Sequence, residues 1–237
     1  MSAYKSLTVI PAWAFQGHPN IEELDCHDGV KVVEAGAFDG CRSLRRVIMP
    51  GVEVVECNAF CDCDALTDVE CGNLELIVEH AFDSCLSLRS IDLPSAEIAY
   101  PGAFFCCEAL TNVKFGVKLE SIRDGAFLDC TSLERITIPL KDGMIDAADV
   151  FFSCESLKYV DDLVEGAILH KTIAALQMEE WKNDVNEEIV SINQVLSTTP
   201  AGNAALGVVG GKTEAIQTWI RSVLHKVLQY KAEHRHF

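Results

Sequence analysis

The sequence predicts a repeat solenoid, a stack of parallel β-strands about seven turns long, followed by an α-helical hairpin. Three observations lead to this fold class. Phenylalanine recurs every 22 to 24 residues, a cysteine follows it at a constant distance, and the C-terminal part of the 237-residue chain changes to the apolar spacing of helices. We expect the solenoid to occupy residues 1–165 and the helical segment to occupy residues 166–237.

Seven phenylalanines set the register of the repeat: Phe15, Phe38, Phe60, Phe82, Phe104, Phe127 and Phe151. From Phe38 onward a cysteine stands three residues after each of them: Cys41, Cys63, Cys85, Cys107, Cys130 and Cys154. Aliphatic residues stand six and nine positions after each phenylalanine. A unit of this length cannot bury its own apolar row, so it gains stability only by stacking on its neighbours.

Each turn is expected to contain a short strand around the aliphatic residue nine positions after the phenylalanine, such as Val69 or Ile136. Proline or glycine follows most of these strands, where the chain must turn out of an extended run. A second short extended piece then leads to a corner, which reads Gly-Ala-Phe at residues 102–104. In the seventh turn this corner is Asp-Val-Phe at residues 149–151, as expected for a terminal turn that caps the core.

One of these units, residues 125–139 (GAFLDCTSLERITIP), resembles the BspA-like subclass of leucine-rich repeats, whose turn reads AF..C..L..I.IP. The resemblance recurs six or seven times over about 150 residues. It implies a protein-binding scaffold with parallel strands on its concave side, and it carries over no catalytic residue. Bacterial members are often surface proteins, whereas residues 1–15 contain no apolar leader, so we expect this chain in the cytosol or nucleus.

The C-terminal segment predicts two helices that reverse the chain. Apolar residues recur three or four apart from Ile168 to Leu196 and again from Thr213 to about His234, which is one face of a helix. Residues 197–202 between them are rich in Ser, Thr, Pro and Gly and break the helical pattern. The second helix resembles the helical tail that follows BspA-like repeats. Whether the hairpin packs on the solenoid or on another copy stays open.

Net charge limits the classes of partner. The chain has a formal charge of −17, and residues 1–166 account for all of it with 12 basic and 29 acidic residues. Nucleic acid and anionic membrane are therefore disfavoured as main partners, because both would be repelled. No apolar stretch approaches the roughly 20 residues that a membrane helix needs.

The eleven cysteines predict core packing rather than a cofactor site. Cys57, Cys61 and Cys63 lie close together, as metal ligands do, and redox roles are a further alternative. Most cysteines, however, repeat with the turn, so they occupy equivalent places in successive layers, where a small and partly apolar side chain fills the corner. We expect reduced thiols, no metal and no cofactor.

Catalytic signatures fail for specific reasons. The seven histidines keep no repeat register, and His80 takes the place of glycine in a corner. Residues 207–213 (GVVGGKT) resemble a phosphate-binding loop, but Leu206 stands where the motif needs glycine, and no strand precedes it. We therefore expect a binding protein and not an enzyme.

Residues eight and ten positions after each phenylalanine should point away from the core, because side chains alternate along a strand. Eleven of them form the predicted binding face on the concave side: Glu23, Asp25, Arg46, Ile48, Asp68, Glu70, Asp92, Asn112, Lys114, Arg135 and Tyr159. Its middle is acidic and is flanked by basic residues, so the expected partner has a basic centre and an acidic rim. Tyr159 and Ile48 are the candidate anchors. In the alternative interpretation these side chains only solvate the strands.

Two functional hypotheses follow. The first is an interaction scaffold that binds a protein partner through the concave face. The second is a structural or self-associating module in which the C-terminal helices form a homo-oligomer, since their apolar faces could pair with another copy.

Overall fold

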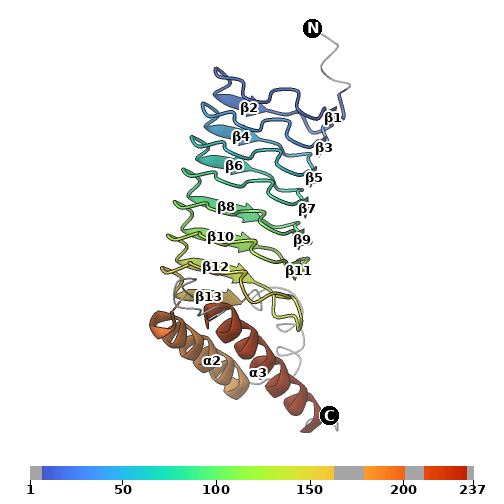
Figure 1. Cartoon of the computed structure of the whole chain (residues 1–237). Helices are drawn as coiled ribbons and strands as arrows, with labels where there is room; N and C mark the ends of the chain where they lie inside the picture. The colour runs from blue at the N-terminus through green and yellow to red at the C-terminus, as the bar shows by residue number, and fades with distance from the viewer. Residues whose placement is uncertain (1–6, 163–178, 201–210, 234–237) are drawn as a thin grey trace.

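The computed structural model describes residues 7–162, 179–200 and 211–233 of the chain. A column of stacked turns makes up the repeat region, and helices α2 (Glu179–Thr198) and α3 (Gly211–Glu233) lie against its C-terminal end (Figure 1). The predicted solenoid with a helical segment is thereby confirmed as the fold class.

Each turn contributes one strand to a row of longer strands: β2 (Glu23–Asp25), β4 (Arg46–Ile48), β6 (Asp68–Glu70), β8 (Ser90–Leu93), β10 (Asn112–Phe115), β12 (Arg135–Ile138) and β13 (Tyr159–Asp162). The second row has two-residue strands: β1 (Val9–Ile10), β3 (Val32–Val33), β5 (Val54–Val55), β7 (Leu76–Ile77), β9 (Ile98–Ala99) and β11 (Ser121–Ile122). Every pairing is parallel, and equivalent residues face each other, as Val47 faces Val69. The register is thus the one that the repeat predicts.

The phenylalanine column forms the centre of the core. Phe38 to Phe151 are buried, and the rings of successive turns stack with centroids 5.1 to 5.8 Å apart. Phe15 is the exception to the predicted core column. Its ring stacks on Phe38, but no earlier described turn covers its other side, and 40% of the residue is exposed.

The six cysteines that follow a phenylalanine by three residues, here called the column cysteines, each make a contact that the spacing did not reveal. The Sγ of each donates a weak hydrogen bond to the carbonyl oxygen of the phenylalanine one turn earlier, over 3.0 to 3.3 Å. All six column cysteines are buried, which confirms the core-packing interpretation, and all eleven cysteines of the chain are free thiols. Most of these carbonyl oxygens also accept a backbone N–H, as Phe38 O does from Cys41, so the thiol adds a second hydrogen bond inside the corner.

Each corner from Phe15 to Phe127 has one residue in the left-handed backbone region two positions before the phenylalanine and one two positions after it, whereas the corner at Phe151 has only Ser153, two positions after it. Gly102 has a φ of 63° at the first position, and His80 has a φ of 56° at the equivalent place one turn earlier. The substitution of glycine by His80 is therefore a strained one for a residue with a Cβ atom. Its ring lies over Gly102, where an added Cβ would come within 2.5 Å of it.

The two helices form the predicted antiparallel hairpin. An ion pair joins Glu188, midway along α2, to Lys226 in the second half of α3, and Gly211 at the start of α3 lies against Pro200 just after α2. Their inward side chains are buried: Ile192, Leu196, Ile216, Trp219, Ile220 and Val223. The predicted first helix starts at Ile168, but residues 163–178 lie outside the described residues, as do the side chains of several predicted helix-face residues.

The hairpin packs on the last turn of the solenoid and closes it with polar side chains. In the preceding turn, the backbone N–H of Phe127 donates to the carbonyl oxygen of Val150. The N–H of Phe151 donates instead to Thr213 Oγ1 at 3.2 Å, and the N–H of Val160 donates to Asn193 Oδ1 at 3.0 Å. These helix side chains take the place of the backbone acceptors that a further turn would supply.

The first turn ends differently. In later turns the N–H four residues before the phenylalanine donates to the turn before, as Glu34 N–H does to Ile10 O. Pro11 stands at this position in the first turn and has no N–H to leave unpaired. The proline and the short strand β1 blunt an exposed sheet edge.

Candidate functional site

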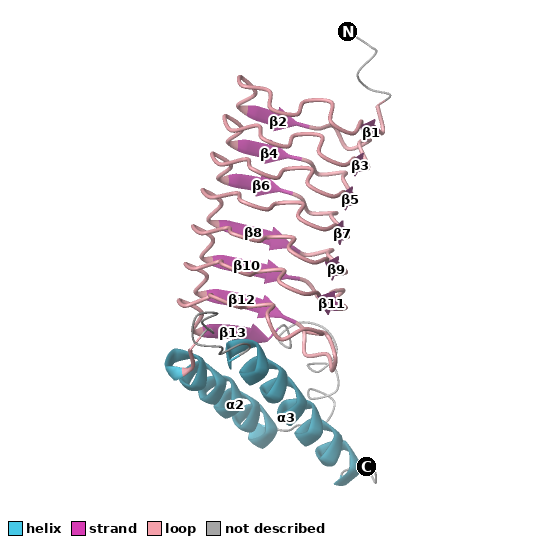
Figure 2. Cartoon of the chain, viewed as in Figure 1, coloured by secondary structure: helices cyan, strands magenta, loops and turns pink. Residues whose placement is uncertain are grey.

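The long strands place all eleven predicted binding residues on one surface, the row of magenta arrows from β2 to β13 in Figure 2. We define the strand face as the outward side chains of this row. Its members alternate with buried residues, as Asp68 and Glu70 do around Val69. All eleven are exposed or half-buried in the structure. They lie on two successive parallel sheets, β2-β4-β6 and β8-β10-β12-β13, and within each sheet the pairing register is uniform.

Several charges on the strand face neutralise one another. The Arg46 guanidinium lies 3.1 Å from Asp68 and 2.5 Å from Glu70, both on the neighbouring strand β6. Arg135 lies 2.5 Å from Asp161 and 4.5 Å from the centroid of the Tyr159 ring. Two of the three cations expected to flank the acidic centre are therefore held by acids of the same face.

The remaining charges of the strand face are mostly acidic. Glu23, Asp25, Asp92 and Lys114 have no ion-pair partner among the described residues. Of the two candidate anchors, Ile48 is half-buried, and Tyr159 is 40% exposed with Arg135 over its ring. The face thus offers unpaired carboxylates near β2 and at β8, with an aromatic contact near the helices.

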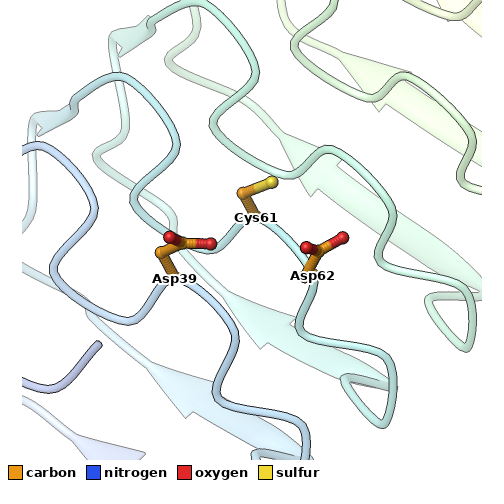
Figure 3. A group of neighbouring side chains, drawn as sticks. All are labelled: Asp39, Cys61 and Asp62. Carbon is orange, nitrogen blue, oxygen red and sulfur yellow. The ribbon is translucent and has the colours of Figure 1, made fainter. Parts of the chain in front are cut away.

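Within the described residues, one group of three potential metal ligands lies close together. Asp39, Cys61 and Asp62 come from neighbouring turns, with ligand atoms within 4.8 Å of one another (Figure 3). Burial, together with the charges of nearby carboxylates, raises the pKa of Cys61 to about 12, so it carries a neutral thiol. Asp39 already accepts a hydrogen bond from Gln16. The group lacks the converging thiolates or imidazoles of a preformed zinc site.

The other two cysteines that lie close to Cys61 in the sequence point elsewhere. Cys63 donates to the carbonyl oxygen of Phe38, and Cys57 donates to Glu79 Oε2. Proximity in the sequence therefore does not bring these three thiols together. The sequence did not predict the group of Asp39, Cys61 and Asp62, because Asp39 belongs to the preceding turn and becomes a neighbour of Cys61 only when the turns stack.

One arrangement resembles catalytic machinery but cannot act as such. His80 Nδ1 lies 2.9 Å from Asp83 Oδ2, and Ser84 Oγ donates to the other oxygen of Asp83 at 2.8 Å. The serine hydroxyl is bonded to the carboxylate and not to the histidine, so no base is in place to activate it.

Lys212, which belongs to the segment that resembles a phosphate loop, has a structural role. Lys212 is 2% exposed, and its ammonium donates to the carbonyl oxygens of Glu155 at 2.8 Å and Leu157 at 2.6 Å. Burial lowers the pKa of Lys212, since the charged form loses hydration. The lysine holds α3 on the last turn, which agrees with the sequence-based rejection of a nucleotide site.

None of the helices in the described ranges has both the length and the apolar character required to cross a bilayer.

Stacked parallel strands with a repeated Phe and Cys register define the chain as a leucine-rich-repeat solenoid. The chain belongs to the BspA type leucine rich repeat family, whose model matches residues 1–100 and 53–162 with six copies. No curated protein shows significant sequence similarity to it.

Two solved structures support the assignment. The chain is 25% identical to a leucine-rich repeat protein of T. pallidum, with a TM-score of 0.58 over 73% of this chain and 78% of that one. It is also 25% identical to a leucine-rich cell surface protein of Faecalibacterium prausnitzii, with a TM-score of 0.53 over 68% of this chain. The match spans 45% of that second protein, so this chain corresponds to less than half of its length.

Proposed function

We propose that this chain is a non-enzymatic interaction scaffold that binds a protein partner through the strand face. The observation that carries the proposal is a contrast within each turn. The buried Phe, Cys and Leu positions repeat with little change, whereas the outward positions differ from turn to turn. A uniform core that displays a varied, largely rigid surface suits recognition of a protein.

Charge supports a basic partner. The unpaired carboxylates Glu23, Asp25 and Asp92 favour Lys or Arg on the facing surface, and such complementarity raises association rates and selectivity. Arg46 and Arg135 are engaged by neighbouring acids, so we revise the expected acidic rim of the partner to a smaller acidic contact near Lys114.

Self-association through the helices has less support. The apolar side chains between α2 and α3 are already buried against each other and against the last turn. Val190, Val195 and Leu228 stay exposed on the two helices. Light scattering on the full chain separates this hypothesis from the scaffold.

The test compares partner capture by the parent chain with capture by a triple variant of the unpaired carboxylates, Glu23→Lys, Asp25→Lys and Asp92→Lys. A matched control reverses three acids beside the opposite strand row, Glu75→Lys, Glu97→Lys and Glu120→Lys, for the same change of charge. Proteins bound by the parent and the control, but lost from the folded strand-face variant, support the proposal. Equal capture by all three proteins contradicts it.

A further inference from the structure

A small recess lies where α3 meets the segment between β12 and β13. Its volume is about 130 Å³, and its lining includes Lys141, Asp142 and Gly143 from the solenoid and Gln217 and Arg221 from α3. About four water molecules of roughly 30 Å³ each would fill it. Pockets for drug-sized ligands start near about 300 Å³, so this one suits a single oxyanion group.

The recess lies in the longest interval of the repeat, the 24 residues from Phe127 to Phe151. Met144 N–H donates to Lys141 O here, in the kind of turn that Leu119 N–H and Gly116 O form one repeat earlier. Gly143 takes a φ of 70°, which a residue with a Cβ atom adopts only at a cost. The N–H groups of Asp142 and Gly143 have no acceptor among the described residues.

Two cations meet at this recess without an acidic partner. No carboxylate in the described part of the chain lies within 4.0 Å of the charged nitrogens of Lys141 or Arg221. Asp142 is the one acid in the lining, so two positive charges against one negative leave a formal charge of +1.

Local hydrogen bonds hold Arg221 at this position. Its Nε donates to the carbonyl oxygen of Gln217 at 3.3 Å, and Gln217 Nε2 donates to Ile145 O at 3.0 Å. The same glutamine therefore fixes the helix on the solenoid and orients the guanidinium beside the recess.

We propose that this recess binds a phosphoryl oxyanion, either free phosphate or the phosphate of a phosphorylated side chain. The guanidinium offers paired N–H donors, the Lys141 ammonium offers a point charge, and the turn offers free backbone N–H groups. Because Lys141 belongs to the solenoid and Arg221 to α3, the bound anion also joins the two parts of the chain. The proposal does not depend on the strand face.

Isothermal titration calorimetry on the full chain tests the proposal, with inorganic phosphate in one arm and O-phosphoserine in the other. Serine serves as the control ligand, and ionic strength is held at about 0.15 M, where the Debye length is about 8 Å. We expect saturable binding at one site and a higher melting temperature with ligand. Binding of both ligands, or of only one, supports the site and identifies the source of the phosphate.

Variants give the direction of the effect. Arg221→Gln should weaken phosphate binding about tenfold, as expected for a lost charged hydrogen bond, and Lys141→Gln provides a second variant if the first disturbs α3. Asp142→Asn should strengthen binding, because it removes the repulsive charge. Lys158→Gln, an exposed basic residue outside the recess, should leave binding unchanged.

Three results would overturn the proposal. The first is the lack of saturable heat with either phosphate ligand. The second is equal weakening by Lys158→Gln and Arg221→Gln, which would indicate a general charge effect. The third is weaker phosphate binding by Asp142→Asn. The negative charge of Asp142 should repel a phosphate in the recess, so its removal cannot weaken binding if the phosphate lies there.

Discussion

The Sγ atom of Cys85 donates a hydrogen bond of 3.2 Å to the carbonyl oxygen of Phe60, the residue that heads the preceding turn. The same contact recurs in each turn that has the Phe and Cys pair. The repeated cysteine therefore fills the corner and also donates a weak hydrogen bond to a backbone carbonyl group.

Replacing Cys85 by alanine should destabilise the chain by about 1 to 3 kcal/mol, through the lost weak hydrogen bond and the small cavity. Cys57→Ala is the matched control, because Cys57 is half-buried outside the column, and it should cost less than about 0.5 kcal/mol. Denaturant unfolding monitored by circular dichroism measures both values. Equal costs for the two variants would contradict the role of the column.

Stability should fall as pH rises from about 9 to 10. Burial raises the pKa of Cys71 to about 12 and raises the pKa values of Cys85 and Cys130 well above the usual 9.0. The stabilising contribution of each thiol is complete below pH 9 and is lost above it, because the unfolded chain ionises first. At pH 10 the loss is about 1.4 kcal/mol for one deeply buried thiol.

Denaturant midpoints at several pH values check this prediction, and the Cys85→Ala variant should lose about 1.4 kcal/mol less than the parent at pH 10. Burial lowers the pKa of Lys212, which acts in the opposite direction for one group only. A midpoint that stays constant up to pH 10 would show that the thiols are more hydrated than the structure implies.

Glycines at one repeat position should differ in their tolerance of alanine. A Cβ at Gly116 would come within 1.9 Å of the Pro94 carbonyl oxygen, whereas a Cβ at Gly72 would meet nothing within 4 Å. Gly116→Ala should therefore cost about 2 to 4 kcal/mol, and Gly72→Ala should be neutral or stabilise by up to about 1 kcal/mol. Thermal unfolding gives the melting temperatures of the two variants. Similar melting temperatures would contradict the close contact between Gly116 and the Pro94 carbonyl oxygen.

Phe82→Ala should cost about 3 to 5 kcal/mol, because the ring is fully buried between two others. Phe15→Ala should cost clearly less, because its ring is partly exposed and stacks on one side only. Urea denaturation at neutral pH gives both numbers. A loss at Phe15 as large as the loss at Phe82 would mean that another part of the chain covers the first turn.

Thr213→Val should destabilise the chain by about 1 to 3 kcal/mol, since it leaves the buried N–H of Phe151 without its acceptor while keeping the side-chain shape. Thr218→Val on the exposed side of α3 is the control and should change stability by less than about 0.5 kcal/mol. Hydrogen exchange at the Phe151 amide provides a local readout, and unchanged protection in Thr213→Val would argue against this contact.

The sequence by itself determined the register of the solenoid. Equivalent residues recur 22 to 24 positions apart, so stacking brings each Phe, Cys and strand residue onto its counterpart, and the outward positions follow from alternation along the strand. His80 could be assigned to a glycine corner for the same reason. A period translates directly into spatial neighbours only where the turns repeat.

Contacts that do not recur from turn to turn could be identified only in the tertiary structure. The bonds from Lys212, Thr213 and Asn193 to the last turn join residues 33 to 62 positions apart, with no repeat to set their register. The pairing of Arg46 with Asp68 and Glu70 depends on how long side chains lean across strands. The sequence placed these charges on one surface, but side-chain geometry decided which of them neutralise each other and which stay free for a partner.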